Sequence, residues 1–213
     1  MVNKKLLEII KEIPCSSWAV WSKGFPEEGC LEDREDAEKT IRNNIGELGP
    51  SVILVSLNPA EKIPKNFSNF HSLDSKHSDY NLKKYIQENN LGKIKGAYMT
   101  DLVKSRTGSE GKDTEVKKED CKKFLEEIKL FDKFKDIENF NVICFGRKVF
   151  NGFLDYFEGQ KEELGKNIYF FKTSQEGFEV NFYGVYFFGS RGFNHKSVLE
   201  LEDQLKFLNK EKL

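Results

Sequence analysis

The chain has 213 residues, of which 38% are hydrophobic and 32% charged, a composition typical of a globular protein with a sizeable core and not of a disordered chain. Its 34 basic and 35 acidic residues leave a net charge of -1, which argues against a protein that coats nucleic acid by charge alone. The N-terminus lacks the long apolar stretch of a signal peptide, and no later segment is apolar enough to span a membrane. We therefore expect a cytoplasmic protein.

Four cysteines are present, Cys15, Cys30, Cys121 and Cys144, and none belongs to a Cys-x-x-Cys pair. Zinc and iron-sulfur sites usually need closer ligand spacing, so the spacing predicts reduced thiols that pack in the interior. Phe is unusually common at 19 residues, and we expect most of these rings to fill the core.

Apolar residues at helical spacing predict a short N-terminal helix that ends at Pro14. The same pattern predicts a helix over 33–47, closed by Gly49-Pro50. Residues 1–48 thus form a helical extension packed on the sheet of a single domain that spans 1–213.

Runs rich in β-branched and aromatic residues predict four strands, at 52–57, 96–101, 141–146 and 184–188. Helical patterns lie between them, after Leu82 and over 117–131 and 148–157, and another follows the last strand. Residues 167–188 alternate around a Gln175-Glu176-Gly177 turn and predict a hairpin that runs into the final strand. The alternation predicts an α/β fold with three layers: a mostly parallel, four-stranded central sheet with helices on both faces.

Polar residues follow each predicted strand: Asn58-Pro59, Thr100-Asp101, Gly146-Arg147, and a last group of Arg191, His195, Lys196 and Ser197. If the strands are parallel, these residues share one edge of the sheet, the edge at which open α/β sheets bind ligands. The alternative is structural, since Asn, Asp, Gly and Ser are good turn residues wherever strands end.

Some of these residues resemble a known family. Ser56-Leu57-Asn58-Pro59-Ala60 resembles the first motif of the uracil-DNA glycosylase superfamily, in the form found in its mismatch-specific, thymine-DNA-glycosylase-like branch. His195-Lys196-Ser197 resembles the family's His-Pro-Ser motif, and 142–148 is similar to its third core strand. The likeness covers the order of elements from about residue 50 onward. Ser56 stands where Gly is usual, Lys196 replaces the proline, and the leucine wedge loop is missing.

The resemblance implies a role for each matching residue. Asn58 would position a water molecule at the sugar carbon, and His195 would stabilise the charge on the leaving base. Phe70, twelve residues after Asn58, would stack on the extruded base, while Thr100 or Asp101 would read its edge. The expected phosphate contacts are Arg147, Arg191, Lys196 and Ser197, and no metal or organic cofactor is implied.

The sequence thus predicts a monomeric, monofunctional DNA glycosylase that hydrolyses the N-glycosidic bond of uracil or a related damaged base. Its partner would be single- or double-stranded DNA, with no membrane involved. Two alternatives stay open. One is a catalytically inactive module of the same fold that binds nucleic acid, a nucleotide or a protein, and the other is a small-molecule hydrolase or transferase.

Overall fold

The computed structural model describes residues 2–13, 16–21, 34–58, 78–104, 114–132, 137–175, 177–186 and 195–213. The elements in chain order are α1 (Val2–Glu12), β1 (Ser17–Trp18), α2 (Arg34–Asn43), the 3-10 helix η1 (Ile45–Glu47), β2 (Gly49–Ser56), α3 (Ser78–Glu88), β3 (Ala97–Asp101), α4 (Lys118–Asp132), β4 (Asn139–Phe145), α5 (Arg147–Tyr156), β5 (Glu162–Gly165), β6 (Ile168–Gln175), β7 (Phe178–Val185) and α6 (His195–Glu211).

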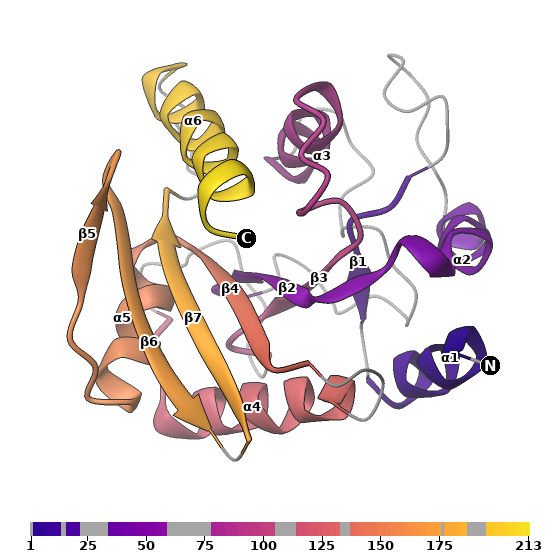
Figure 1. Cartoon of the computed structure of the whole chain (residues 1–213), viewed down its shortest axis with the longest axis horizontal. Helices are drawn as coiled ribbons and strands as arrows, with labels where there is room; N and C mark the ends of the chain where they lie inside the picture. The colour runs from indigo at the N-terminus through magenta and orange to yellow at the C-terminus, as the bar shows by residue number, and fades with distance from the viewer. Residues whose placement is uncertain are drawn as a thin grey trace.

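One mixed sheet contains all the described strands, in the order β1-β3-β2-β4-β7-β6-β5 (Figure 1). The four inner strands β3, β2, β4 and β7 are parallel to one another, whereas β1 and the β6-β5 pair run antiparallel to their neighbours. The α/β class and the parallel centre predicted from the sequence are confirmed. The predicted count of four strands is wrong, because the sheet has seven.

The strands that the sequence did not indicate are short or lack an apolar pattern. β1 is only two residues long, and β5 exposes Glu162 and Glu163 to solvent at the edge of the sheet. Gly49-Pro50, expected to close a helix, instead opens β2, where the Gly49 amide donates to the Gly96 carbonyl. The predicted hairpin is confirmed, since Gln175 of β6 pairs with Phe178 of β7.

The central strand β2 carries the reason for the three layers. Ile53, Leu54 and Val55 are fully buried, and successive side chains of a strand point to opposite faces of the sheet. Ile53 and Val55 join a core with residues of α1, α2, α4 and α5, whereas Leu54 joins a second core with residues of α3 and α6. Helices therefore cover both faces, as predicted, with α3 and α6 on one side and α4 and α1 on the other (Figure 1).

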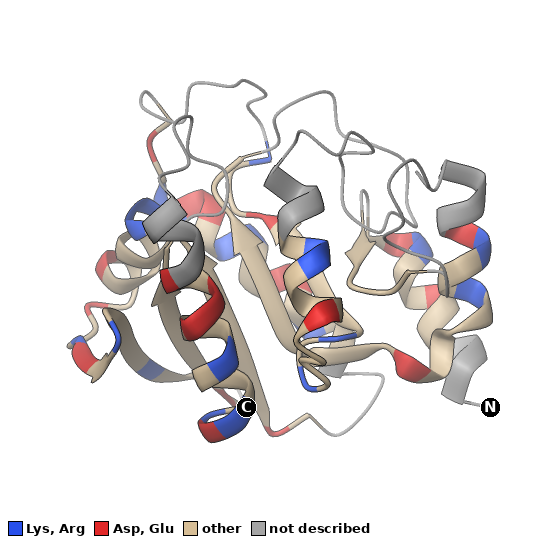
Figure 2. Cartoon of the chain, turned by 90° about the horizontal axis from the view of Figure 1, so that it is seen from above, with Lys and Arg blue, Asp and Glu red and all other residues tan. Residues whose placement is uncertain are grey.

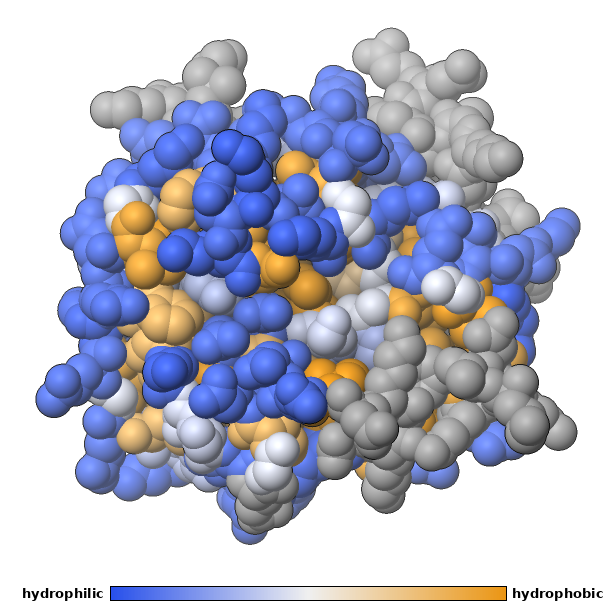
Figure 3. Space-filling view, viewed as in Figure 1, coloured by the Kyte–Doolittle hydropathy of each residue, from blue (hydrophilic) through white to orange (hydrophobic). Residues whose placement is uncertain are grey.

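The Phe-rich composition serves the first of these cores. Phe171 of β6 and Phe182 of β7 stack with their rings 4.7 Å apart, and Phe153 of α5 packs on Phe182 at the same separation. Apolar side chains also show on the outer surface only in small groups between hydrophilic ones (Figure 3). Among the described residues, no helix is both long enough and apolar enough to cross a membrane.

Candidate functional site

The carboxyl ends of the four parallel strands meet at one edge of the sheet. Ser56 at the end of β2 lies opposite Asp101 at the end of β3, and Phe145 of β4 lies opposite Val185 of β7. The backbone stays in register just past β3, because the Leu102 amide donates to the Ser56 carbonyl at 2.9 Å. The polar residues that follow the strands therefore start from a common edge, as the sequence predicted.

The two residues at the end of β3 serve different faces of the sheet. The Thr100 hydroxyl donates to Glu127 of α4, while Met99 packs in the core shared with α3 and α6. Because side chains alternate along a strand, Asp101 points to the α3 and α6 face and Thr100 to the α4 face. A ligand on one face cannot contact both, so the two predicted base-reading positions are alternatives and not partners.

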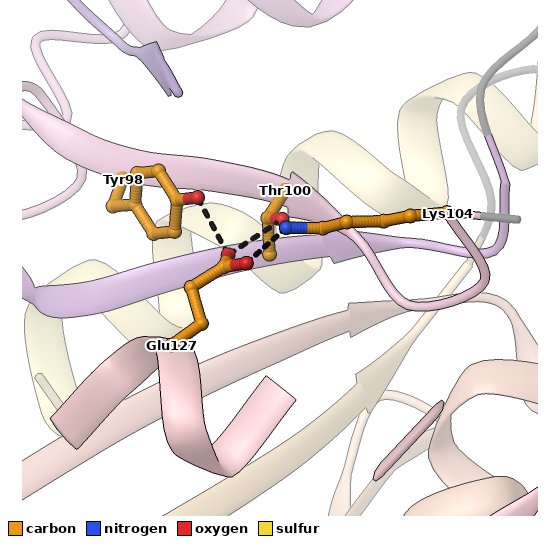
Figure 4. Close-up of polar contacts among 4 residues, drawn as sticks. All are labelled: Tyr98, Thr100, Lys104 and Glu127. Carbon is orange, nitrogen blue, oxygen red and sulfur yellow. Dashed lines mark hydrogen bonds and ion pairs between the residues drawn. The ribbon is translucent and has the colours of Figure 1, made fainter. Parts of the chain in front are cut away.

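On the α4 face, three donors converge on the Glu127 carboxylate (Figure 4). The Tyr98 hydroxyl donates to it at 2.6 Å, the Thr100 hydroxyl at 2.9 Å, and the Lys104 ammonium forms an ion pair with it. The Glu127 side chain is only 12% exposed. A buried carboxylate is stable only when it is paired and hydrogen-bonded, and this cluster supplies both conditions.

The Tyr98 phenol is tuned by the same cluster. Burial, first, and the negative charge of Glu127, second, hold the pKa of Tyr98 well above its usual value, and Asp101 adds a smaller push in the same direction. The hydroxyl therefore stays protonated and keeps donating to Glu127. This network fixes the end of β3 against α4, and so fixes the direction in which Asp101 faces the opposite side.

On the α3 and α6 face, Ser56 and Asp101 lie side by side on neighbouring strands, about 5 Å apart between backbones. Both residues are buried, with 6% and 8% of their surface exposed. The Ser56 hydroxyl has no hydrogen-bond partner within the part of the chain that the structure describes. A buried polar group without a partner is uncommon, and it indicates a place where a water molecule or a ligand group completes the bonding.

The covering helix α3 adds a buried cation to this face. Lys83 is 3% exposed, and it is the one lysine among the described residues that is classed as buried. It takes part in a polar interaction, as a buried ammonium must. Its neighbours Leu82 and Ile86 pack in the core beneath α3, which fixes the helix on the sheet.

A second group of polar side chains lies at the end of β7. The Tyr186 hydroxyl bonds to Glu200 of α6, and burial together with that carboxylate raises the pKa of Tyr186, while Arg147 lowers it. Gln204 of α6 accepts from the Tyr186 amide at 2.9 Å and donates to the Lys166 carbonyl at 2.9 Å. These bonds attach the middle of α6 to the strand end.

The other predicted site residues are distributed as follows. Asn58 directly follows β2, is half-buried and takes part in a polar interaction. Arg147 is exposed at the start of α5. His195, Lys196 and Ser197 form the first turn of α6, where only the backbone is described. Phe70 and Arg191 lie outside the described residues, so their predicted roles stay predictions.

The helix geometry constrains the predicted meeting of Asn58 and His195. His195 precedes Gln204 by nine residues, which is about 13 Å of helix axis. Because Gln204 is fixed at the end of β7, His195 begins α6 at the far end of that length. Whether its imidazole turns back toward Asn58 stays a prediction.

Sequence analysis missed the residues that define the two faces of this edge, Ser56, Lys83, Tyr98 and Glu127. Glu127 had a readable signal, because it shares a helix stripe with Phe124, Ile128 and Phe131, and a carboxylate in an apolar stripe needs donors opposite. For Ser56, the departure from the usual Gly was visible, but the missing partner was not.

Charge is mixed across the described surface, with Lys and Arg interspersed with Asp and Glu along the helices (Figure 2). The described residues contain no group of three or more His, Cys, Asp or Glu side chains arranged to hold a metal ion. No model of a known protein family matches the chain, and no curated protein is significantly similar to it. The function must therefore be argued from the fold and from this edge of the sheet.

Proposed function

We propose that the protein is a monofunctional DNA glycosylase with a fold like that of uracil-DNA glycosylases. The observation that carries the proposal is the common edge: four parallel strands in the order β3-β2-β4-β7 bring Asn58 and Asp101 to one end of the sheet, and α6, which follows β7, begins with His195. A pair of adjacent parallel strands with polar ends is where an α/β sheet binds its ligand.

The reaction needs little from the protein beyond positioning and charge stabilisation. Water attacks the sugar carbon that bears the base, the carbon-nitrogen bond breaks, and the base leaves with the bonding electron pair. Asn58 orients the water but, as a carboxamide, is a poor base, so the reaction depends on a good leaving group. The His195 imidazole stabilises the negative charge that develops on the base.

The remaining predicted residues complete the proposal. Phe70 stacks on the extruded base, an interaction of about 1–3 kcal/mol that offsets part of the cost of unstacking it. Arg147, Arg191, Lys196 and Ser197 contact phosphates beside the pocket, which fixes the DNA without reading its sequence. Asp101, on the α3 and α6 face, is the residue that reads the base edge.

Release of a base is the direct test. The protein is incubated with single- and double-stranded oligonucleotides that carry one uracil, and alkali then converts each abasic site into a strand break. We expect breaks with the wild-type protein and a loss of at least about 100-fold in the Asn58→Ala variant, as is common when a group that acts in the transition state is removed. Asn151→Ala is the matched control, because Asn151 is exposed on α5.

Three outcomes separate the candidate functions. Breaks that persist unchanged in Asn58→Ala would contradict the proposed role of that residue. DNA binding without breaks on any substituted base would favour a non-catalytic module, which agrees with the absence of a strong base at Asn58. No interaction with DNA at all would leave a small-molecule enzyme on the same sheet as the better account.

A further inference from the structure

The residue that faces the proposed base pocket is a carboxylate, and this has a consequence for the choice of base. An ionised Asp accepts hydrogen bonds and cannot donate them, whereas a carboxamide at the same place could do both. The edge of uracil presents an acceptor, a donor and an acceptor in turn. Asp101 could therefore accept from only one group of uracil, and its second oxygen would face a carbonyl oxygen, which is repulsive.

Ser56 supplies the complementary group. Its hydroxyl lies on the same face as Asp101, at the paired position of the neighbouring strand, and it is buried without a partner in the described structure. A hydroxyl beside a carboxylate can donate to an acceptor that lies next to the groups bound by the carboxylate. The two residues together present two acceptors followed by a donor.

From this pattern we infer that Ser56 and Asp101 form a subsite for a guanine-type base, a 2-amino-6-oxopurine. Such a base presents its amino group and ring N–H side by side to the carboxylate, and its adjacent carbonyl to the Ser56 hydroxyl. Cytosine and adenine each offer a ring acceptor where the carboxylate needs a donor. The inference rests on the proposed function and narrows its substrate from damaged bases in general to one edge pattern.

The chemistry of Asn58 favours one kind of guanine lesion. Since a carboxamide is a poor base, the leaving group must be good, and alkylation of the purine N7 places a positive charge on the base that leaves. The bond between sugar and base breaks with its electron pair moving to the base, which becomes neutral as it departs. The edge that Asp101 and Ser56 would read keeps its amino group and carbonyl.

The test compares bases across three proteins. Oligonucleotides with a single N7-methylguanine or a single uracil are treated with the wild type, Asp101→Asn and Ser56→Ala, and the released base is measured by chromatography. We expect the wild type to release methylguanine in preference to uracil. Asp101→Asn should lower methylguanine release by about 10- to 100-fold, the range for a charged hydrogen bond, and raise uracil release. Ser56→Ala should lower methylguanine release by about 2- to 10-fold.

A binding measurement separates this inference from the proposed function. Ligand-observed NMR with 9-ethylguanine and 1-methyluracil reports recognition of the edge without any chemistry. Guanine binding that Asp101→Asn abolishes, without base release, would uphold the subsite and overturn the glycosylase. Uracil release exceeding methylguanine release in the wild type, or equal effects of Asp101→Asn on both bases, would overturn the subsite and leave the glycosylase standing.

Two further outcomes also count against the subsite. If no base is released and neither analogue binds, both proposals fall. If Ser56→Ala changes no base release but lowers the midpoint of thermal unfolding, the hydroxyl serves only a buried water molecule. Asp101→Asn is nearly isosteric, and circular dichroism of each variant checks that the fold is kept.

Discussion

At the scale of single residues, Glu127 is the acceptor that holds one strand end in place. Three donors reach it from β3 and the residues after it, and each would be left unpaired if the carboxylate were removed. Leaving a buried donor unpaired costs more than the hydrogen bond itself contributes, because the desolvation of that donor is no longer compensated. Glu127 therefore matters through the groups it satisfies.

The corresponding prediction concerns stability. Glu127→Ala should lower the free energy of unfolding by about 1–3 kcal/mol, because the fully buried Tyr98 hydroxyl loses its acceptor. Glu127→Gln should cost less, since its amide oxygen still accepts from Tyr98. Urea denaturation measures both. In a Tyr98→Phe background the cost of Glu127→Ala should shrink, and an unchanged cost would show that the two residues are not coupled.

Two cysteines give a second prediction at this scale. Cys121 and Cys144 are buried free thiols; burial raises the pKa of Cys121 to about 12 and that of Cys144 well above its usual value. Thiolates are the reactive form, so both should resist modification in the folded protein. In a Cys15→Ser/Cys30→Ser variant, Ellman's reagent at pH 8 should find almost no thiol before unfolding and two after it. Rapid reaction of the native protein would contradict this.

At the scale of elements, the sequence predicted the inner strands and the helices because each carries its own period. β2 and β4 are buried on both faces and read as continuous apolar runs, and α4 carries apolar residues at helical spacing. The outer strands escaped prediction because their order comes from pairing: Ser17 and Trp18 form a strand only against Tyr98 and Met99. Which residue of Thr100 and Asp101 faces the pocket also needed the partner helix to be known.

The joint before β3 supplies the prediction for this scale. Gly96 has a φ of +81°, and a Cβ placed on it would lie 2.0 Å from the Glu47 carbonyl oxygen. Its amide and carbonyl bond to Ala19 and Gly49, which ties β1 and β2 to the start of β3. Gly96→Ala should therefore cost at least about 2 kcal/mol of unfolding free energy, from backbone strain and from overpacking.

Gly92 is the matched control for that substitution. It lies four residues earlier, and a Cβ there would meet nothing within 4 Å. Gly92→Ala should change stability by less than about 1 kcal/mol, since only the conformational freedom of the unfolded chain changes. Equal losses for the two variants in thermal and urea unfolding would mean that the joint is not tightly packed.

At the scale of the whole molecule, the stability of the fold is tied to groups that must stay protonated inside it. Burial raises the pKa of Tyr183 to about 12 and that of Cys121 to about 12, and it holds Tyr98 and Cys144 well above their usual values. All four lie in the two cores or on the sheet between them. In the unfolded chain the thiols lose their protons near pH 9 and the phenols near pH 10.

The sign of the pH effect follows from these shifts. Above pH 9 the unfolded state releases protons that the native state still holds, so the unfolded state becomes the more favoured as pH rises. The stability from these groups is complete below about pH 8 and declines between about pH 9 and 12, by up to about 1.4 kcal/mol per pH unit for each group. Urea unfolding at pH 7, 9, 10 and 11 should show this decline, steepest above pH 10.

Substitution isolates the contribution of one group within that decline. Tyr98→Phe removes one proton from the difference between native and unfolded states, and it should flatten the slope above pH 10 by about one proton while lowering stability at pH 7. Tyr156→Phe is the control, because Tyr156 is only partly buried where Tyr98 is enclosed. A slope unchanged by Tyr98→Phe would mean that the phenol ionises as readily inside the folded protein as outside it, and the enclosed network around Glu127 would then have to be open to water.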